Sequence, residues 1–278
     1  MKQIYGVIGN PVGHSLSPDM HEEAFRELNI NASYHAFLVP DGRLQQAVDG
    51  IRGLGIRGVN VTLPHKVEVM NYLDEIHPLA EEIGAVNTIV NENGKLTGYN
   101  TDGEGYVHGL MPILPKELKN IRALIIGSGG AAKAAAVTLA KYNIHGLVIA
   151  NRTVEKAYAL AKICEEWTES SAINLGRAQA RLTEFDLIIN TTSIGMSPDT
   201  GKMPLSLETL SEGTVVSDLI YTPAKTRWLQ DAEARGAIIQ NGLDMFINQG
   251  ALAFEKWTGQ EAPREIMKKK VIGKLGGK

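Results

Sequence analysis

The chain has 278 residues, a net charge of −3 and an isoelectric point near 6.2. This balance gives no basic surface for nucleic acid or an anionic membrane, so we expect neither as a partner. The lone cysteine, Cys164, excludes an intramolecular disulfide, and no apolar run approaches the roughly 18 residues of a membrane span. A cytoplasmic globular protein of one large or two smaller domains fits these features.

Short β-rich runs alternate with helical patterns through the first part of the chain. Pro18 at a first helical turn, with Ser17 before it as a cap, favours a helix start. The pair Asn93-Gly94 favours a hairpin turn between two strands. We expect strands at residues 4–9, 32–38, 58–62, 85–91 and 95–99, and helices at 18–28, 44–54 and 103–111.

The pattern restarts after Pro112 and Pro115, which mark the expected domain junction. Strands are expected at residues 123–126, 146–150, 186–190, 214–218 and 237–240, and helices at 131–142, 154–167, 224–235, 245–256 and 263–271. The last two helices are not needed to complete the second sheet. We therefore expect them to pack on the first domain.

Together these elements predict an α/β protein with two domains and a cleft between them. Residues 1–112, completed by residues 245–278, would form an α/β substrate-binding and catalytic domain. Residues 113–244 would form a Rossmann-type, doubly wound parallel sheet that binds a dinucleotide.

Residues 127–132 read Gly-Ser-Gly-Gly-Ala-Ala, between an apolar strand and an Ala-rich helix. In this geometry backbone N–H groups and a helix N-terminus can hold a pyrophosphate. Ala132 stands where a third glycine is common, a replacement that helix–strand packing allows. A tight strand–helix turn without a ligand is the alternative.

Residues 151–153, Asn-Arg-Thr, follow the next strand. NAD-preferring sites use a carboxylate there to bind the ribose 2′-hydroxyl. Arg152 instead offers a planar group with several donors, which suits a 2′-phosphate and so indicates NADP. Lys156, one helical turn later, could assist or could be a solvated helix residue.

Polar clusters in the first part lie at the ends of expected strands and helices. The hydroxyls of Ser15 and Ser17 could both bind one carboxylate, or could only stabilise the turn and cap the helix. Lys66 is expected to open a helix, where a cation opposes the helix dipole, so its placement suggests a role other than stability, with a plain surface lysine as the alternative. None of the seven histidines has the spacing of a metal site, and we expect no metal.

Asp102 lies just before an expected helix and could serve as its N-cap. Paired with Lys66, it would instead form an acid–base couple. Hydride transfer to a ketone requires a proton for the nascent alkoxide, and a lysine near a carboxylate can supply it. Lysine, with a pKa of about 10.4 in its free form, is protonated at neutral pH.

Taken in order, these segments resemble the shikimate dehydrogenase family along essentially the whole chain. The matching motifs are residues 15–17, 60–66, 84–88, 100–103, 127–130, 151–153, 190–196, 218–223 and 242–249. The resemblance implies reversible reduction of 3-dehydroshikimate to shikimate by NADPH, in the biosynthesis of chorismate and the aromatic amino acids. It also implies a monomer or homodimer.

The resemblance implies roles for individual residues as well. Ser15 and Ser17 would bind the substrate carboxylate, Lys66 would be the principal acid–base residue, and Asp102 would orient the substrate and share the proton transfer. The remaining substrate contacts would be Thr62, Asn87, Tyr221 and Gln249. The cofactor contacts would be Gly127, Ser128, Gly129, Gly130 and Ala131 at the pyrophosphate, Asn151, Arg152, Thr153 and Lys156 at the 2′-phosphate, and Leu219 and Gly242 at the nicotinamide.

Two other functions are weighed against this one. A quinate/shikimate dehydrogenase that prefers NAD would tend to carry an acidic residue after the second strand of the nucleotide domain, where this chain has Asn151 and Arg152. A ligand-sensing regulator that lost the chemistry would not need Lys66 and Asp102, and this chain has no added DNA-binding domain.

Overall fold

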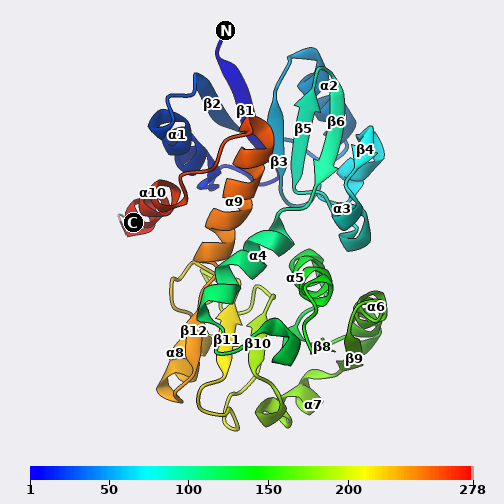
Figure 1. Ribbon diagram of the computed structural model, residues 1–278, viewed down its shortest axis with the longest axis vertical. Helices are drawn as coiled ribbons and strands as arrows, with labels where there is room; N and C mark the ends of the chain where they lie inside the picture. Colours follow the sequence, from blue (N-terminus) through cyan, green and yellow to red (C-terminus); the bar gives the residue numbers. More distant parts are fainter. Residues whose placement is uncertain (277–278) are drawn as a thin grey trace. The chain divides into compact units, whose positions relative to one another are not determined.

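The computed structural model describes residues 1–276, and its chain forms two units (Figure 1). The first unit contains Met1–Thr101 and the segment from Ile247 onwards, and the second contains Asp102–Phe246. Helix α4 (Asp102–Leu110) belongs to the second unit because it packs against α5 (Gly130–Lys141). The boundary between the units thus lies at the start of α4, whereas the sequence predicted a junction near residue 112, just after the end of this helix.

A mixed six-stranded sheet forms the centre of the first unit, in the order β2-β1-β3-β5-β6-β4. Strands β1 and β2, β1 and β3, and β4 and β6 pair in parallel, whereas β5 is antiparallel to both β3 and β6. Its elements are β1 (Gln3–Gly9), α1 (Ser17–Glu27), β2 (Ala32–Leu38), α2 (Leu44–Gly53), β3 (Gly58–Val61), the 3₁₀ turn η1 (Glu68–Tyr72), β4 (Glu75–Ile76), α3 (Pro78–Ile83), β5 (Thr88–Glu92), β6 (Lys95–Tyr99), most of α9 (Leu243–Thr258) and α10 (Arg264–Gly276).

The hairpin between β5 and β6 confirms the Asn-Gly prediction. Glu92 pairs with Lys95, and the two residues between them, Asn93 and Gly94, have φ angles of 56° and 97°. Positive φ at both central positions is what a tight hairpin turn requires, and Asn and Gly are the residues that adopt it most readily.

The two faces of this sheet bury different kinds of side chains. Aliphatic residues of β1, β3, β5, β6 and α2 fill one face, including Ile8, Val59 and Leu44. On the other face, aromatic rings from β1, β2, α1 and α9 pack together. The indole of Trp257 occupies the space beside Gly58, where a Cβ atom would overlap it. Glycine at position 58 therefore allows α9 to lie on the sheet.

All six strands of the second unit are parallel, in the order β12-β11-β10-β7-β8-β9. This is the doubly wound order of a Rossmann fold, with the switch point between β7 and β10. The α/β prediction with a Rossmann-type second sheet is confirmed. Besides α4 and α5, its elements are β7 (Arg122–Ile126), β8 (Gly146–Ala150), α6 (Val154–Cys164), β9 (Glu169–Ile173), α7 (Leu175–Gln179), β10 (Leu187–Asn190), β11 (Val215–Asp218), α8 (Arg227–Ala234) and β12 (Ile238–Gln240), with short 3₁₀ turns between some of them.

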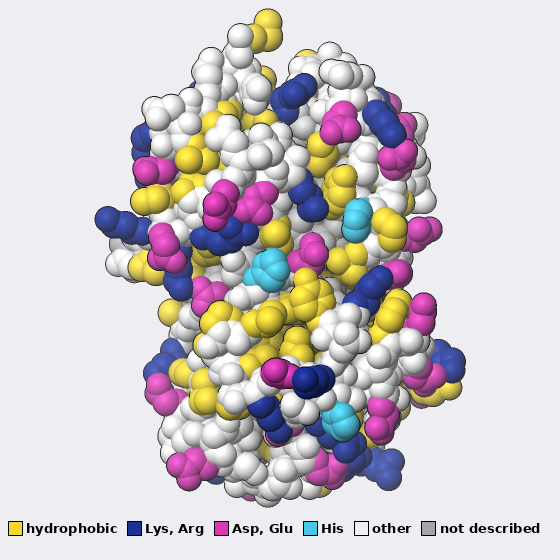
Figure 2. All heavy atoms as spheres, in the orientation of Figure 1, with side chains coloured by type: hydrophobic (Ala, Val, Ile, Leu, Met, Phe, Trp, Pro, Cys, Tyr) yellow, Lys and Arg dark blue, Asp and Glu magenta, His cyan; other side chains and the backbone are white. Residues whose placement is uncertain are grey.

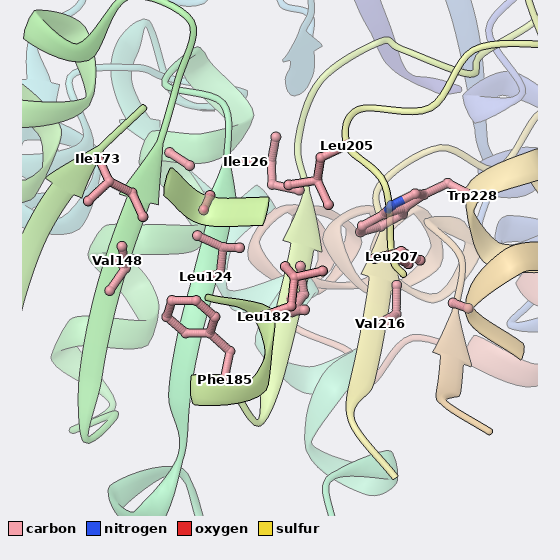
Figure 3. Close-up of a cluster of buried hydrophobic side chains, with 14 of the residues drawn as sticks. Leu124, Ile126, Val148, Ile173, Leu182, Phe185, Leu205, Leu207, Val216 and Trp228 are labelled. Carbon is pink, nitrogen blue, oxygen red and sulfur yellow. The ribbon is translucent and has the colours of Figure 1, made fainter. Parts of the chain in front are cut away.

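One face of this sheet packs on α7, α8 and the adjoining loops (Figure 3). Figure 3 shows Leu124 and Val148 from neighbouring strands, the ring of Phe185 and the indole of Trp228 in one continuous layer. Alternate residues of the same strands, such as Ile125 and Ile149, are buried on the opposite face. Burial on both faces is typical of a parallel sheet between two helical layers.

Several short elements were not expected from the sequence. They are β4, α3, β9 and α7. Strand β9 is an edge strand with the sequence Glu-Ser-Ser-Ala-Ile, and only Ile173 of it is buried. Because its residues are mostly polar, it has no apolar run that would predict a strand. Its extended conformation depends instead on its pairing with β8.

The surface carries charges of both signs, and the single cysteine lies inside the protein. Figure 2 shows basic and acidic side chains interspersed over the face that it presents. None of the helices formed by residues 1–276 combines the length and apolar character that crossing a membrane demands. Cys164 is fully buried, and burial raises the pKa of its thiol to about 12, so the thiol is unreactive at neutral pH.

His21 lies inside the aromatic face of the first unit. Its ring stacks on Tyr34 at 4.5 Å between centroids, and neither ring nitrogen has a hydrogen-bond partner among the described residues. Burial lowers the pKa of His21 to about 3. Because the unfolded chain takes up a proton near pH 6.5 and the folded chain does not, this residue destabilises the fold as the pH falls from 6.5 towards 3.

We therefore expect His21→Leu to reduce the acid sensitivity of the fold. Between pH 7 and pH 4.5 the wild-type chain should lose about 2–3 kcal/mol more of its free energy of unfolding than the variant does. Urea unfolding at the two pH values measures the difference. The exposed His35, replaced by Gln, is the control and should keep the wild-type dependence. An unchanged pH dependence in His21→Leu would contradict this account.

Candidate functional site

The turn after β3 carries Thr62 and Lys66 at one end of the first sheet. Lys66 does not open a helix as expected, because it lies in a turn before the five-residue η1, which begins at Glu68. The helix dipole therefore has no bearing on the role of Lys66. What fixes the turn is His65, a buried residue whose Nε2 lies 2.8 Å from the Val39 carbonyl oxygen.

Main-chain hydrogen bonds bring this turn beside Asn87. The Val86 N–H donates to the Lys66 carbonyl at 2.8 Å, and the Val61 N–H donates to the Asn87 carbonyl at 2.8 Å. Asn87 itself precedes β5, which begins three residues later than expected from the sequence. The fold thus gathers Thr62, Lys66 and Asn87, which are separated by up to 25 positions in the chain, at the same end of the sheet.

The carboxamide of Asn87 is held in one orientation. Its Oδ1 accepts from the Thr101 main-chain N–H at 2.8 Å and from the Thr88 hydroxyl at 3.0 Å. Its Nδ2 therefore points the other way, 2.9 Å from Thr101 Oγ1 and 3.5 Å from Gln249 Oε1. Asn87 and Gln249, expected together from the sequence, are adjacent, and Asn87 turns its donor end towards Gln249.

Behind Asn87 lies a buried set of polar side chains whose role is not predictable from the sequence. The Tyr34 hydroxyl donates to Asn60 Oδ1 at 2.7 Å. Asn60 Nδ2 donates to Thr88 Oγ1 at 3.1 Å and to the Asn87 carbonyl at 3.2 Å. The Thr88 hydroxyl in turn donates to Asn87 Oδ1 at 3.0 Å. Asn60 is the first residue of the motif at residues 60–66. Nothing in the sequence indicates that Tyr34, which is remote in the chain, would contact it.

Ser15 and Ser17 lie at the start of α1. Ser17 was expected to be the N-cap of α1, but it is the first helical residue. Leu16 takes the cap position without a side-chain hydrogen bond. The Ser15 Oγ accepts from the Ser17 N–H at 3.2 Å, so Ser15 does stabilise the turn. Pro18 lies in the first helical turn, as the sequence predicts.

The glycine turn of the second unit follows β7 and leads into α5, beside the switch point of the sheet. Gly127 has a φ of 114°, and a Cβ there would lie within 2.5 Å of Thr191 Oγ1, so the fold itself requires glycine. Gly129 and Gly130 are different. Neither has a positive φ, and a Cβ at either position would meet no atom within 4 Å.

The open space at Gly129 and Gly130 faces an uncapped helix end. Gly129 is the N-cap residue of α5, and no side chain caps the 12-residue helix. Free N–H groups at a helix N-terminus attract anions, and the absence of side chains lets a ligand approach the backbone. Ser128 and Ala131, which flank these glycines, are half-buried.

Residues 151–153 turn away from the carboxyl end of β8, next to β7 in the sheet. The Asn151 Nδ2 donates to the Thr153 carbonyl at 3.0 Å, which closes the turn with Arg152 at its tip. Arg152, Thr153 and Lys156 are exposed. The structure therefore places two cations just beyond the carboxyl end of β8, Arg152 in the turn and Lys156 in the first turn of α6.

Leu219 and Gly242 lie against each other in the second unit. A Cβ at Gly242 would overlap the Leu219 carbonyl group, and the Gly242 N–H donates to the Ile220 carbonyl at 3.0 Å. The ring of Tyr221 packs on Phe246 with centroids 5.2 Å apart. Leu219 and Tyr221 belong to the loop that follows β11, and Gly242 and Phe246 pack against this loop. Asp102, the first residue of α4, belongs to this unit, and its expected pairing with Lys66 stays a prediction.

Family models match three stretches of the chain. They are a shikimate dehydrogenase substrate-binding domain at residues 7–89, a shikimate/quinate 5-dehydrogenase domain at 111–197 and a shikimate 5′-dehydrogenase C-terminal domain at 242–272. A shikimate dehydrogenase (NADP(+)) of Bacillus cereus strain 03BB102 is 54% identical over 277 residues, with all of both chains covered. The chain belongs to the shikimate dehydrogenase family. As a member it is an oxidoreductase that acts on a CH–OH group.

Solved structures of the shikimate dehydrogenase family share the fold of this chain. A shikimate dehydrogenase crystallised with NADP⁺ is 45% identical, with a TM-score of 0.93 and coverage of 99% of this chain and 96% of that one. The enzyme of Thermus thermophilus, in complex with NADP(H) and shikimate, is 36% identical with a TM-score of 0.89, and the match covers 98% of this chain and 99% of that one.

Proposed function

We propose that this chain catalyses the reversible, NADP-dependent reduction of 3-dehydroshikimate to shikimate, a step towards chorismate and the aromatic amino acids. The proposal rests mainly on the 54% sequence identity, over 277 residues, between this chain and a shikimate dehydrogenase (NADP(+)). The unit that begins at Met1 would bind substrate and the Rossmann unit would bind NADP.

The glycine turn fits a dinucleotide. Glycine is not needed for folding at positions 129 and 130, where a Cβ would meet nothing, yet the backbone there is bare at a helix N-terminus. A pyrophosphate needs this close approach to N–H groups, so Gly127 to Ala131 would hold it. Leu219 and Gly242 would border the nicotinamide.

When bound, NADPH supplies the hydride. Residues of this chain would donate and accept the proton. Lys66 would donate a proton to the substrate oxygen as it becomes an alkoxide and would take it back in shikimate oxidation. Asp102 would accept a hydrogen bond from a neighbouring substrate hydroxyl, orient the ring and share the proton transfer.

The polar residues of the first unit suit a hydroxylated carboxylate. Ser15 and Ser17 would donate to the carboxylate. Asn87, whose Nδ2 end faces Gln249, would donate to a ring hydroxyl oxygen, while Gln249 would bind the next polar group. Thr62 and Tyr221 would complete the contacts.

The exposed Arg152 would bind the 2′-phosphate of NADP, together with Asn151, Thr153 and Lys156. We expect Arg152→Ala to raise the KM for NADP⁺ by about 10- to 150-fold, because a hydrogen bond to a charged group contributes about 1.5–3 kcal/mol. The KM for NAD⁺, which lacks the phosphate, should change little.

Steady-state kinetics with both cofactors measures this effect. Arg177→Ala, which removes another exposed arginine of the same unit, is the control and should leave both constants unchanged. Equal increases for NADP⁺ and NAD⁺ in Arg152→Ala would remove Arg152 from 2′-phosphate recognition.

For the setting of the reaction we propose the cytoplasm, which suits a chain with one buried cysteine. We propose a monomer or homodimer as the working state.

A further inference from the structure

Asp218, a residue without a role in the proposed reaction, lies fully buried at the carboxyl end of β11. Its two carboxylate oxygens accept three hydrogen bonds from three directions. Oδ1 accepts from Asn190 Nδ2 at 3.0 Å and from the Ile220 N–H at 3.1 Å, and Oδ2 accepts from the Thr226 hydroxyl at 2.8 Å. Asn190 and Thr226 are also fully buried.

Each donor belongs to a different part of the carboxyl edge of the Rossmann sheet. Asn190 ends β10, and its own Oδ1 accepts from the N–H and the hydroxyl of Thr192 at 3.0 and 2.7 Å. Ile220 lies in the loop after β11. Thr226 caps α8, with its Oγ1 accepting from the Leu229 N–H at 3.3 Å. One carboxylate therefore ties two loops and a helix start together.

The loop after β11 is the one that carries Leu219 and Tyr221. Asp218 holds it from one side through Ile220. From the other side Gly242 packs on the Leu219 carbonyl with no room for a side chain. A loop fixed on both sides has one position, so the surface it offers to a ligand is set before binding.

Burial raises the pKa of Asp218 to about 6, while its three hydrogen bonds act in the opposite direction. The carboxyl group is therefore ionised at pH 7, and an ionised carboxylate only accepts hydrogen bonds. All three donors around it are oriented by that requirement.

We propose that Asp218 is a positioning residue for hydride transfer: by holding the loop from Leu219 to Tyr221 it sets where the nicotinamide ring lies. This inference rests on the proposed function, because it takes Leu219 as the neighbour of that ring. Asp218 touches neither substrate nor cofactor in this account and acts through its loop.

Two substitutions separate geometry from charge. Asp218→Asn keeps Oδ1 as the acceptor for Asn190 and Ile220, and its new amide group can donate to Thr226, whose hydroxyl is able to accept. Asp218→Ala removes the carboxylate that all three donors share. Thr226→Val is the control for stability alone, since it removes one bond of the set and leaves the one to Ile220.

The test combines a binding constant with an isotope effect. NADP⁺ binding is titrated directly, and shikimate oxidation is followed with shikimate deuterated at the carbon that gives up the hydride. For Asp218→Ala we expect a Kd for NADP⁺ raised by about tenfold or more and a larger primary isotope effect on kcat, because a misplaced ring slows the hydride step. Asp218→Asn and Thr226→Val should both resemble the wild type in these two measurements.

Unchanged binding and isotope effect in Asp218→Ala would overturn the inference, as would losses in Thr226→Val equal to those in Asp218→Ala. Amide exchange of the wild-type chain gives a test that needs no variant to fold: the Ile220 amide should be protected, and rapid exchange there would also overturn it. A wild-type chain that does not oxidise shikimate with NADP⁺ would instead refute the proposed function.

Discussion

Replacing Lys66 by Ala is expected to lower kcat for shikimate oxidation by about 10²–10⁴-fold, the usual contribution of a positioned acid–base group. The KM for shikimate should change little, because Lys66 acts on the proton that moves in the transition state. Steady-state kinetics at saturating NADP⁺ measures both constants. A kcat within twofold of the wild type would remove Lys66 from the mechanism.

The control for Lys66→Ala is Lys95→Ala, which removes an exposed lysine of the same unit whose ion pair is with Glu75 on the neighbouring strand. It should leave kcat and KM unchanged. Asp102→Asn should also lower kcat, by less than Lys66→Ala does, because the amide keeps a hydrogen bond to the substrate but loses the charge and the capacity to share the proton transfer.

Gly129→Ala is expected to leave the fold unchanged and to weaken NADPH binding by about 5- to 150-fold. A Cβ at this position meets no protein atom and the backbone has an ordinary φ, so the thermal midpoint should stay at the wild-type value. A ligand that lies directly on the backbone would be displaced by the new methyl group, at a cost of about 1–3 kcal/mol.

The matched control is Gly201→Ala, another substitution in the second unit at which a Cβ meets nothing. It should change neither stability nor NADPH affinity. Direct titration of NADPH, together with thermal unfolding, checks both variants. Wild-type affinity in Gly129→Ala would contradict the claim that the cofactor pyrophosphate lies over this turn.

The sequence predicted most of this fold because its strands have strong local signals. Strand β2 begins and ends where the apolar alternation does, and Asn93-Gly94 forms the expected turn. Strand β9 was missed because its residues are polar, and it is a strand only by pairing with β8 at the edge of the sheet. Helix α3 and strand β4 are too short for a periodic pattern to emerge.

The site shows the same division between local signals and packing. Gly127 and Arg152 are indicated by motifs whose spacing reflects backbone geometry. The expected roles of Ser17 as a cap and of Lys66 as a helix opener were wrong, because the chain begins each helical segment one or two residues from the place that local signals favour. Tyr34 donates to Asn60, 26 positions away, and Asp218 accepts from Asn190, 28 positions away, and only the folded structure brings these pairs together.

The most direct test of the central claim is an oxidation assay of the purified chain with shikimate and quinate side by side, each with NADP⁺ and NAD⁺. We expect kcat/KM to be highest for shikimate with NADP⁺ and much lower for the pairs that contain NAD⁺ or quinate. Comparable kcat/KM values for NAD⁺ and NADP⁺ would contradict the cofactor assignment. Oxidation of quinate in preference to shikimate would contradict the substrate.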